Sequence, residues 1–184
     1  MAADGPGRLL CVGGPPGSGK TTVGALVARA AGVALVDLDS VTTPLLEAVA
    51  AADGLPVDLD SPRFAALREA RYACLAAVVA DCVRSGVDVV AVAPFTREAA
   101  DGSWSAWGAA AGATSVTTCW LHVPADLLAT RVRARGLARD LAKAGAPVPA
   151  ATVAPASVDL LVDAAGAGPD DLVARVLAGW SARP

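Results

Sequence analysis

The stretch from Gly13 to Thr22, with the sequence GGPPGSGKTT, limits the possible folds of this chain of 184 residues more than any other. It contains the pattern G-x-x-x-x-G-K-[ST] between Gly14 and Thr21, which is typical of a loop that wraps around a phosphate group. The apolar run 9–12 before it predicts a strand, and apolar residues at helical spacing after it predict a helix. A glycine-rich turn with an incidental lysine would not require these neighbours. The sequence therefore predicts a phosphate site between the first strand and the first helix.

The residue types in this loop match the chemistry of phosphate binding. Glycines allow the backbone to turn so that successive N–H groups point at one phosphate, and the N-terminal end of the following helix adds partial positive charge. We expect Lys20 to reach the β- and γ-phosphates of a nucleotide and the Thr21 hydroxyl to bind Mg²⁺. The residues assigned to the nucleotide are Gly14, Pro15, Gly17, Ser18, Gly19, Lys20, Thr21 and Thr22.

The composition favours one folded domain over residues 1–184 and excludes several classes of protein. Hydrophobic residues make up 54% of the chain and charged residues 18%, so the chain can bury a sizeable core and is not expected to be disordered. The net charge of −3 gives no general attraction to nucleic acid or to an anionic membrane. The longest uncharged run, residues 102–125, contains too many glycine, serine and threonine residues to cross a bilayer.

The N-terminus predicts a cytoplasmic protein, and the state of the cysteines follows from that prediction. Residues 1–7 lack the basic start and the apolar segment of a signal peptide. In the cytoplasm the four cysteines remain reduced, and because all four stand in apolar surroundings we interpret them as small core residues. His122 is the only histidine, which argues against a histidine-based catalytic triad or a histidine-rich metal site.

Apolar runs alternate with helical patterns along the rest of the chain, which predicts an α/β fold. Gly32 should end the first helix, and Pro169 should open the last one. Trp104 and Trp107 stand one helical turn apart, and we interpret them as packing a helix on the body of the domain. Further strands are expected at 33–38, 87–93, 117–123 and 158–162.

The segment between the second and third strands should hold a short helix and a loop within 41–60, then a long helix. Ser61 and Pro62 are suited to the N-cap and first position of that helix, and Gly86 to its end. The side of the long helix that should face the core is formed by Phe64, Leu67, Cys74, Leu75, Val78 and Cys82.

Two aspartates follow the second strand. Alternation places Asp37 and Asp39 on one side if the strand continues that far, at the edge where open α/β sheets bind ligands. They could instead begin a turn with Ser40, with Asp39 capping the next helix. Because the end of the third strand offers no carboxylate, we expect Asp37 to support Mg²⁺ beside Thr21. Asp39 is nearer the variable segment 41–60, and we expect it to be the base that contacts an acceptor hydroxyl.

A basic stretch follows the fourth strand. Five cations and one anion stand within residues 131–143 of an acidic chain, and a proline-containing segment comes next. This could be only a solvated face. Opposite a triphosphate it is better interpreted as a lid, about 131–149, whose arginines neutralise the transferred phosphoryl group. We assign Arg131, Arg135 and Arg139 to the phosphates, with Arg135 as a catalytic candidate. Substrate candidates on other elements are Arg68, Arg71 and Arg97, of which Arg68 and Arg71 could equally be surface residues.

These motifs together resemble the small phosphate-loop kinases related to nucleoside monophosphate kinases: shikimate kinase, gluconate kinase and chloramphenicol phosphotransferase. The resemblance is carried by Gly14–Thr22, by Asp37-Leu38-Asp39 and by the lid arginines. It implies a three-layer α/β/α domain with a five-stranded parallel sheet and a small lid. It also implies ATP, with GTP left open, together with Mg²⁺. Asp39-Ser40 is similar to the pair that supplies the base in chloramphenicol phosphotransferase.

The expected function is an ATP-dependent kinase that moves the γ-phosphoryl group to a hydroxyl of a small molecule. An antibiotic, in resistance or self-protection, or a sugar-like metabolite would suit the resemblance. The chain departs from the family pattern, because the third strand has no acidic end and the arginine set that grips shikimate is not seen. The alternatives are a nucleotide-hydrolysing switch or ATPase without an acceptor, and a polynucleotide-end kinase. The missing third-strand acid and the net charge of −3 argue against them. No nucleic acid or membrane partner is expected, and the chain should be a monomer or homodimer.

Overall fold

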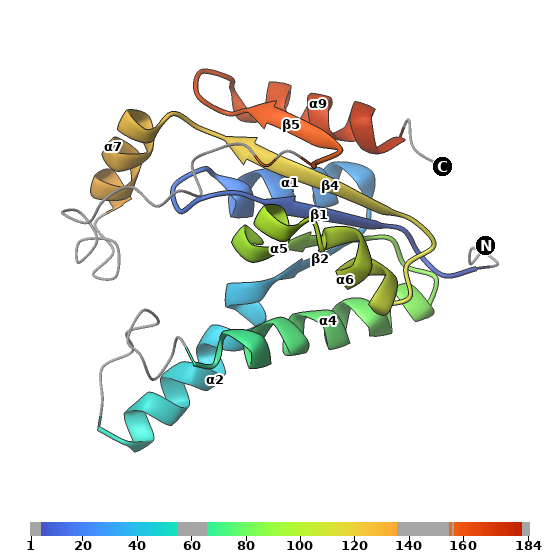
Figure 1. The fold of residues 1–184 in the computed structure, drawn as a ribbon, viewed down its shortest axis with the longest axis vertical. Coiled ribbons are helices and arrows are strands. Elements are labelled where there is room, and N and C mark those ends of the chain that lie inside the picture. The colour runs from blue at the N-terminus through green and yellow to red at the C-terminus, as the bar shows by residue number, and fades with distance from the viewer. Residues whose placement is uncertain (1–4, 55–65, 136–154, 156, 182–184) are drawn as a thin grey trace.

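A five-stranded parallel sheet forms the centre of the molecule (Figure 1). The computed structural model describes residues 5–54, 66–135, 155 and 157–181. The strand order is β2-β3-β1-β4-β5, and every neighbouring pair is parallel, which confirms the predicted fold class. The strands are β1 Leu9–Gly13, β2 Ala34–Asp37, β3 Val89–Val92, β4 Val116–His122 and β5 Leu160–Asp163.

Strand β1 is the middle of the sheet and sets the position of the phosphate loop. All five of its residues are buried, because helices cover both faces. It pairs with β3 on one side, Leu9 opposite Val89, and with β4 on the other, Leu9 opposite Val116. The chain leaves β1 for β2 on one side and later places β4 on the other. In such sheets a crevice opens at the carboxyl end of the central strand, where ligands bind.

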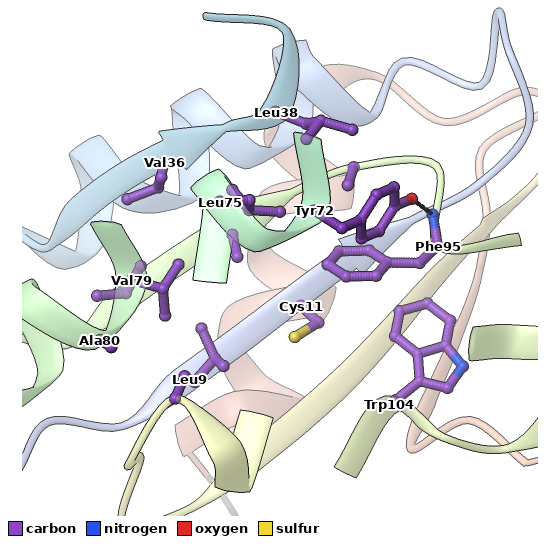
Figure 2. Packing of buried hydrophobic residues seen from close by; sticks show 14 of the residues in the cluster. Leu9, Cys11, Val36, Leu38, Tyr72, Leu75, Val79, Ala80, Phe95 and Trp104 are labelled. Carbon is purple, nitrogen blue, oxygen red and sulfur yellow. Dashed lines mark hydrogen bonds between the residues drawn. The ribbon is translucent and has the colours of Figure 1, made fainter. Parts of the chain in front are cut away.

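Helices cover both faces of the sheet (Figure 1). One core cluster joins α1 and α9 to the face that carries Leu10 and Val12. The other core cluster joins α4, α5 and α6 to the face that carries Leu9 and Cys11 (Figure 2). Helix α2 packs along α4. The helices are α1 Lys20–Ala31, α2 Leu38–Ala52, α4 Arg68–Arg84, α5 Thr96–Asp101, α6 Trp104–Ala110, α7 Ala125–Arg135 and α9 Pro169–Ser181.

An aromatic cluster fixes the segment that follows β3 (Figure 2). Phe95 stacks on Trp104 at a ring distance of 5.0 Å and meets Tyr72 and Trp107 edge-on. The backbone N–H of Phe95 donates to the Tyr72 hydroxyl at 2.9 Å. Phe95 has φ 49, a left-handed conformation that is strained for a bulky residue and requires such surrounding packing. The two tryptophans pack this part of the chain on the body, as predicted, although two short helices replace the single expected one.

The first and last helices agree with the sequence analysis. Gly32 ends α1 with φ 69, as expected of a glycine that follows a helix. Leu172, Val176 and Trp180 form the buried face of α9. Among the described residues, no helix combines the length and apolar character that crossing a bilayer would require.

The segment after β2 differs from the prediction. Helix α2 begins directly at Leu38 and runs for 15 residues with Pro44 inside it, where a short helix and a loop were expected. The strand ends at Asp37, so Asp37 and Asp39 do not share one side of a strand. Asp37, and not Asp39, caps the helix, and its carboxylate accepts from the backbone N–H groups of Asp39 and Ser40.

The buried face of α4 was predicted only in part, with Leu75 buried and Cys82 packed against the core as expected. Its buried residues include Tyr72, Leu75 and Val79, whereas Cys74 and Val78 are exposed. Alanine and valine make up eight of the 17 residues of the helix, so apolar spacing alone could not select the correct face. The proposed start at Ser61-Pro62 lies outside the described residues, and α4 begins at Arg68.

The cysteines do not share one environment. Cys11 and Cys119 are core residues as expected, and burial raises the pKa of both thiols, that of Cys119 to about 12. Cys82 is half-buried, and the exposed position of Cys74 contradicts the prediction of four core cysteines.

Candidate functional site

The phosphate loop follows β1 and depends on its glycines. Gly14, Gly17 and Gly19 have φ of 151, 85 and 90, a region that favours glycine. A Cβ at Gly14 would lie 2.7 Å from the Ser18 Oγ and 3.0 Å from the Leu121 carbonyl oxygen, so no side chain fits there. The loop therefore has a fixed, open backbone shape at the carboxyl end of the central strand.

The N-terminus of α1 is left open for an anion. Gly19 is the N-cap and supplies no side-chain cap, and the first turn contains no acidic residue. Ser18, directly before it, is buried with 1% exposure, and its Oγ has no hydrogen-bond partner within the described part of the chain. Free N–H groups and the positive end of the helix dipole at one point are suited to a phosphate.

Lys20, Thr21 and Asp37 meet at the loop. The Lys20 Nζ donates to the Pro15 carbonyl oxygen at 3.3 Å, which places the ammonium group over the loop. The Thr21 hydroxyl donates to the Asp37 Oδ2 at 3.1 Å, so Asp37 faces the loop from the end of β2. Asp37 is buried, with 7% of its surface exposed.

The same pair fits a magnesium ion chemically. A hydroxyl and a carboxylate are hard oxygen donors of the kind that Mg²⁺ prefers. In the described ranges no three His, Cys, Asp or Glu residues form a cluster that could hold a metal ion alone. An ion here would need further oxygens, which in phosphate-loop sites come from water and from the nucleotide phosphates.

A cavity of about 490 Å³ lies beside the loop. Its volume is typical of small-molecule sites. The Arg131 guanidinium donates to the carbonyl oxygens of Ala164 at 2.9 Å and Ala165 at 3.3 Å, which joins α7 to the segment between β5 and α9. The sequence analysis missed this far wall, because small residues carry no motif. The walls are Gly17, Ser18, Gly19, Thr22, Val23, Arg131, Ala134, Ala164, Ala167, Pro169 and Leu172.

Asp39 is paired with a residue of helix α4. It stands in the first turn of α2, its side chain is 51% exposed, and its Oδ1 accepts from the Arg71 Nη2 at 2.6 Å. The Arg71 Nε donates to the Thr42 hydroxyl at 2.9 Å, and that hydroxyl donates to the Leu38 carbonyl oxygen. Asp39 thus has a partner on α4, Arg71, whereas Asp37 has a partner on α1, Thr21.

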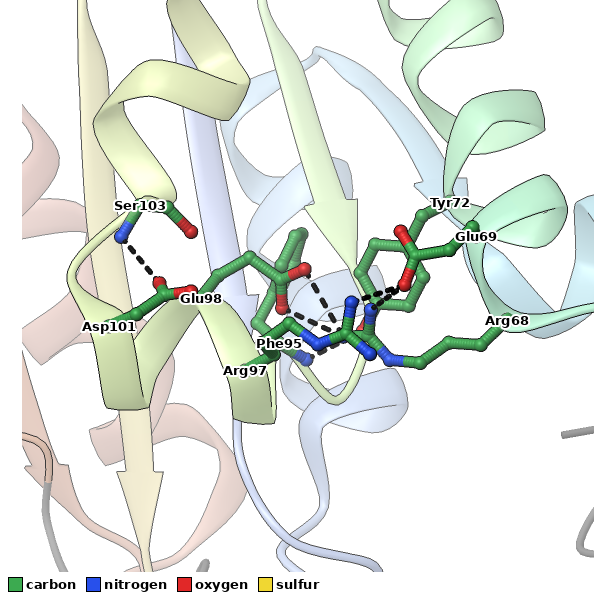
Figure 3. Close-up of polar contacts among 8 residues, drawn as sticks. All are labelled: Arg68, Glu69, Tyr72, Phe95, Arg97, Glu98, Asp101 and Ser103. Atoms are coloured by element: carbon green, nitrogen blue, oxygen red, sulfur yellow. Dashed lines mark hydrogen bonds and ion pairs between the residues drawn. The ribbon is translucent and has the colours of Figure 1, made fainter. Parts of the chain in front are cut away.

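The other two substrate candidates are paired with carboxylates (Figure 3). The Arg68 Nη2 lies 3.1 and 3.0 Å from the two oxygens of Glu98, a buried residue of α5. Glu69 accepts from Arg68 at 3.3 Å and also from Arg97. The sequence analysis did not identify either glutamate, because the pairing joins α4 to α5, which are distant in sequence.

Tyr72 lies beneath this network. The Arg68 guanidinium lies 4.2 Å from the centre of the Tyr72 ring. Burial, and then the Glu98 carboxylate, raise the pKa of Tyr72 to about 12. Burial alone would lower the pKa of Arg68, but the neighbouring Tyr72 and Glu98 raise it. Both residues therefore keep their ordinary protonation states at neutral pH.

The structure brings the predicted site residues together in two groups. Most of the proposed lid lies outside the described residues. Thr21, Lys20 and Asp37 share the loop, and Asp39 pairs with Arg71 across α2 and α4. Of the proposed lid, 131–149, the described part ends at residue 135. The side chain of Arg135 and the whole of Arg139 lie outside the described residues.

Comparisons place the chain among phosphate-loop proteins. The profile of a family described as AAA domain matches residues 9–155. No curated protein matches the sequence. Similar solved structures include the Mycobacterium tuberculosis APS kinase in complex with AMPPNP and APS, with 19% identity and a TM-score of 0.68 over 96% of this chain and 99% of that one.

Two further structures share the fold. A sugar kinase from Janibacter sp. HTCC2649 has 22% identity and a TM-score of 0.63, covering 96% of this chain and 95% of that one. A gluconokinase from Sinorhizobium meliloti 1021 has 21% identity and a TM-score of 0.54, covering 96% and 93%. At these identities the likeness establishes the fold, and it confirms the resemblance to small-molecule kinases at that level.

Proposed function

This chain belongs to the AAA domain family of phosphate-loop proteins, and on that premise we propose that it is an ATP-dependent kinase acting on a hydroxyl group of a small molecule. The family assignment concerns the nucleotide side. The choice of a kinase over a simple ATPase depends on the arrangement at the end of β2.

The observation that carries the proposal is that two aspartates at the end of β2 have partners on different helices. Asp37 accepts from Thr21 on the phosphate side, and Asp39 is held by Arg71 on the side of α2 and α4. Both a hydrolase and a kinase need a second group that orients the nucleophile, which is water in the first and a hydroxyl in the second. The pairing of Asp39 with Arg71 of α4 supports the hydroxyl, because it links this carboxylate to the helices that we assign to an acceptor.

The proposed roles follow from these positions. The loop N–H groups and Lys20 bind the phosphates, and Thr21 and Asp37 would hold Mg²⁺, which neutralises phosphate charge when bound. Arg131 borders the cavity that would take the nucleoside. Asp39 orients and deprotonates the acceptor hydroxyl. Phosphoryl transfer has a loose transition state, so these groups act mainly by positioning and by charge.

Similar structures support a small-molecule acceptor without naming it. These structures are a sugar kinase, an APS kinase with AMPPNP and APS bound, and a gluconokinase. We propose a sugar-like metabolite or an antibiotic as the acceptor class, and ATP as the donor. Arg135 and Arg139 remain proposed phosphate contacts of a lid.

The test is an acceptor screen that measures ADP release together with the mass of the product. The expected result is ADP release that increases with a hydroxyl compound and a product heavier by one phosphoryl group. The matched controls are Lys20→Ala, which should lose the signal, and Asp81→Asn, which removes an exposed partner of Arg84 at the far end of α4 and should keep it. ADP release that no acceptor increases would instead support a nucleotide hydrolase.

A further inference from the structure

We infer that the acceptor of the proposed kinase carries no negative charge close to its reacting hydroxyl, so that a neutral hydroxyl compound is preferred over a carboxylate or phosphate ester. This inference rests on the proposed function and concerns the side formed by α2, α4 and α5. It follows from the way the arginines on this side are already paired.

Arg71 is committed to the proposed base. Its side chain is 15% exposed and contacts Asp39 at 2.6 Å and Thr42 at 2.9 Å. An acceptor carboxylate that took over Arg71 would displace Asp39 from its partner. It would also lie beside the Asp39 carboxylate, and like charges at such a distance repel.

Arg68 is committed to a buried carboxylate. The Glu98 side chain is 10% exposed and that of Arg68 is 26% exposed. If Arg68 turned to an anionic acceptor, Glu98 would remain charged and unpaired in a buried position, which is strongly unfavourable. The positive charge of Arg68 therefore neutralises Glu98 and is not available to an anionic ligand (Figure 3).

Arg97 is the most accessible of the three but is also paired. It contacts Glu69, and both side chains are more than half exposed, so this pair is the weakest. Within the described part of this side, the three arginines are balanced by three carboxylates: Asp39, Glu69 and Glu98.

The experiment compares acceptors in pairs that differ at one carboxylate, which is replaced by a neutral group in one member. Suitable pairs are glucitol with gluconate, and the methyl ester of shikimate with shikimate, each measured by ADP release and product mass with ATP and Mg²⁺. We expect kcat/KM for the neutral member to exceed that for the anionic member by about tenfold or more. Preference for the anionic member would overturn the inference while leaving the kinase proposal intact.

Two variants test whether the ion pairs cause the preference. Glu98→Gln and Glu69→Gln keep side-chain shape but release Arg68 and Arg97, so each should lower the neutral-to-anionic ratio by about threefold or more. Asp81→Asn releases Arg84 on the same helix, far from the site, and should leave the ratio unchanged. The exposed Glu69→Gln serves if Glu98→Gln fails to fold.

The outcomes separate the two claims. A ratio that neither folded variant moves overturns the inference, even if the neutral acceptors are preferred. Absence of any phosphorylated product from every acceptor overturns the kinase proposal, and the inference with it.

Discussion

The two sides of the proposed site are built differently. The phosphate side uses backbone: three glycines with positive φ, an uncapped helix N-terminus and small wall residues. The acceptor side uses charged side chains from α2, α4 and α5, paired across the fold. Phosphate binding therefore depends on one continuous stretch of sequence, whereas acceptor selectivity depends on pairs of residues that are distant in sequence.

The two sides are nevertheless joined. The backbone N–H of Gly14 donates to the Pro94 carbonyl oxygen at 3.3 Å, directly before Phe95 and the helix that carries Glu98. At the end of β2, Asp37 contacts a residue of the phosphate side and Asp39 contacts a residue of the acceptor side. Substitutions on each side should therefore have effects of a different kind and size.

The largest effect should come from the phosphate side. Lys20→Ala removes a cation that we expect to contact the transferred phosphate, so kcat/KM should fall by about 10³-fold or more, equivalent to ~4 kcal/mol. The midpoint of thermal unfolding should stay near that of the wild type, since Lys20 is not part of the core. Near-normal phosphotransfer by a folded Lys20→Ala would contradict the proposed role of the loop.

Asp39→Asn should affect the acceptor step alone. We expect kcat to fall by roughly 10²–10⁴, with nucleotide affinity unchanged, because the proposed role of Asp39, which pairs with Arg71 of α4, is to contact the acceptor. Steady-state kinetics and titration with an ATP analogue measure the two quantities separately. A loss of nucleotide affinity without a loss of kcat would show that the two sides are not separate.

Asp37→Asn should raise the Mg²⁺ concentration needed for half-maximal activity by about tenfold. The amide oxygen still caps α2, so stability should change little, whereas Asp37→Ala should also cost about 1 kcal/mol of stability. Magnesium titrations and thermal unfolding measure these effects. If Asp37→Asn were inactive at saturating Mg²⁺ and Asp39→Asn only required more of it, the two roles would be reversed.

The smallest effect should come from Tyr72, which packs beneath the arginines of the acceptor side. Tyr72→Phe removes the acceptor of the Phe95 N–H, and should lower the free energy of unfolding by about 1–2 kcal/mol. Because the folded pKa of about 12 lies above the ordinary value of 10, the neutral phenol stabilises the fold fully below pH 10, and this contribution is lost as the pH rises from 10 to 12.

Tyr72 is the only tyrosine, so an absorbance titration reports it alone. The wild type should ionise near pH 12 when folded, and an ionisation near pH 10 in the folded protein would contradict its buried position.

The same division explains what the sequence could predict. The phosphate loop, the five strands and the ends of α1 and α9 follow from local patterns, because glycine positions and apolar runs act over a few residues. The face of α4 could be predicted only in part, since its alanines and valines allow several faces. Helix α2 was underestimated because Pro44 usually ends a helix, and here the helix continues through it.

On the acceptor side the candidates were identified but their partners were not. Arg68, Arg71 and Arg97 were chosen because they are cations near the predicted site. Their contacts with Glu98, Asp39 and Glu69 depend on how α2, α4 and α5 pack, which no local pattern specifies.

The central position of β1 has a consequence for how the protein is made. Strand β1 pairs with β3 and β4, so Leu9 can form these pairs only after Val89 and Val116 have left the ribosome. Until then β1 and β2 have no neighbours, because β3 lies between them. The nascent chain therefore exposes β1, a fully buried strand of the folded protein, through about half of synthesis, when unpaired strands are prone to aggregate. Nascent chains that end before β3 should fail to bind nucleotide although the whole phosphate loop is present.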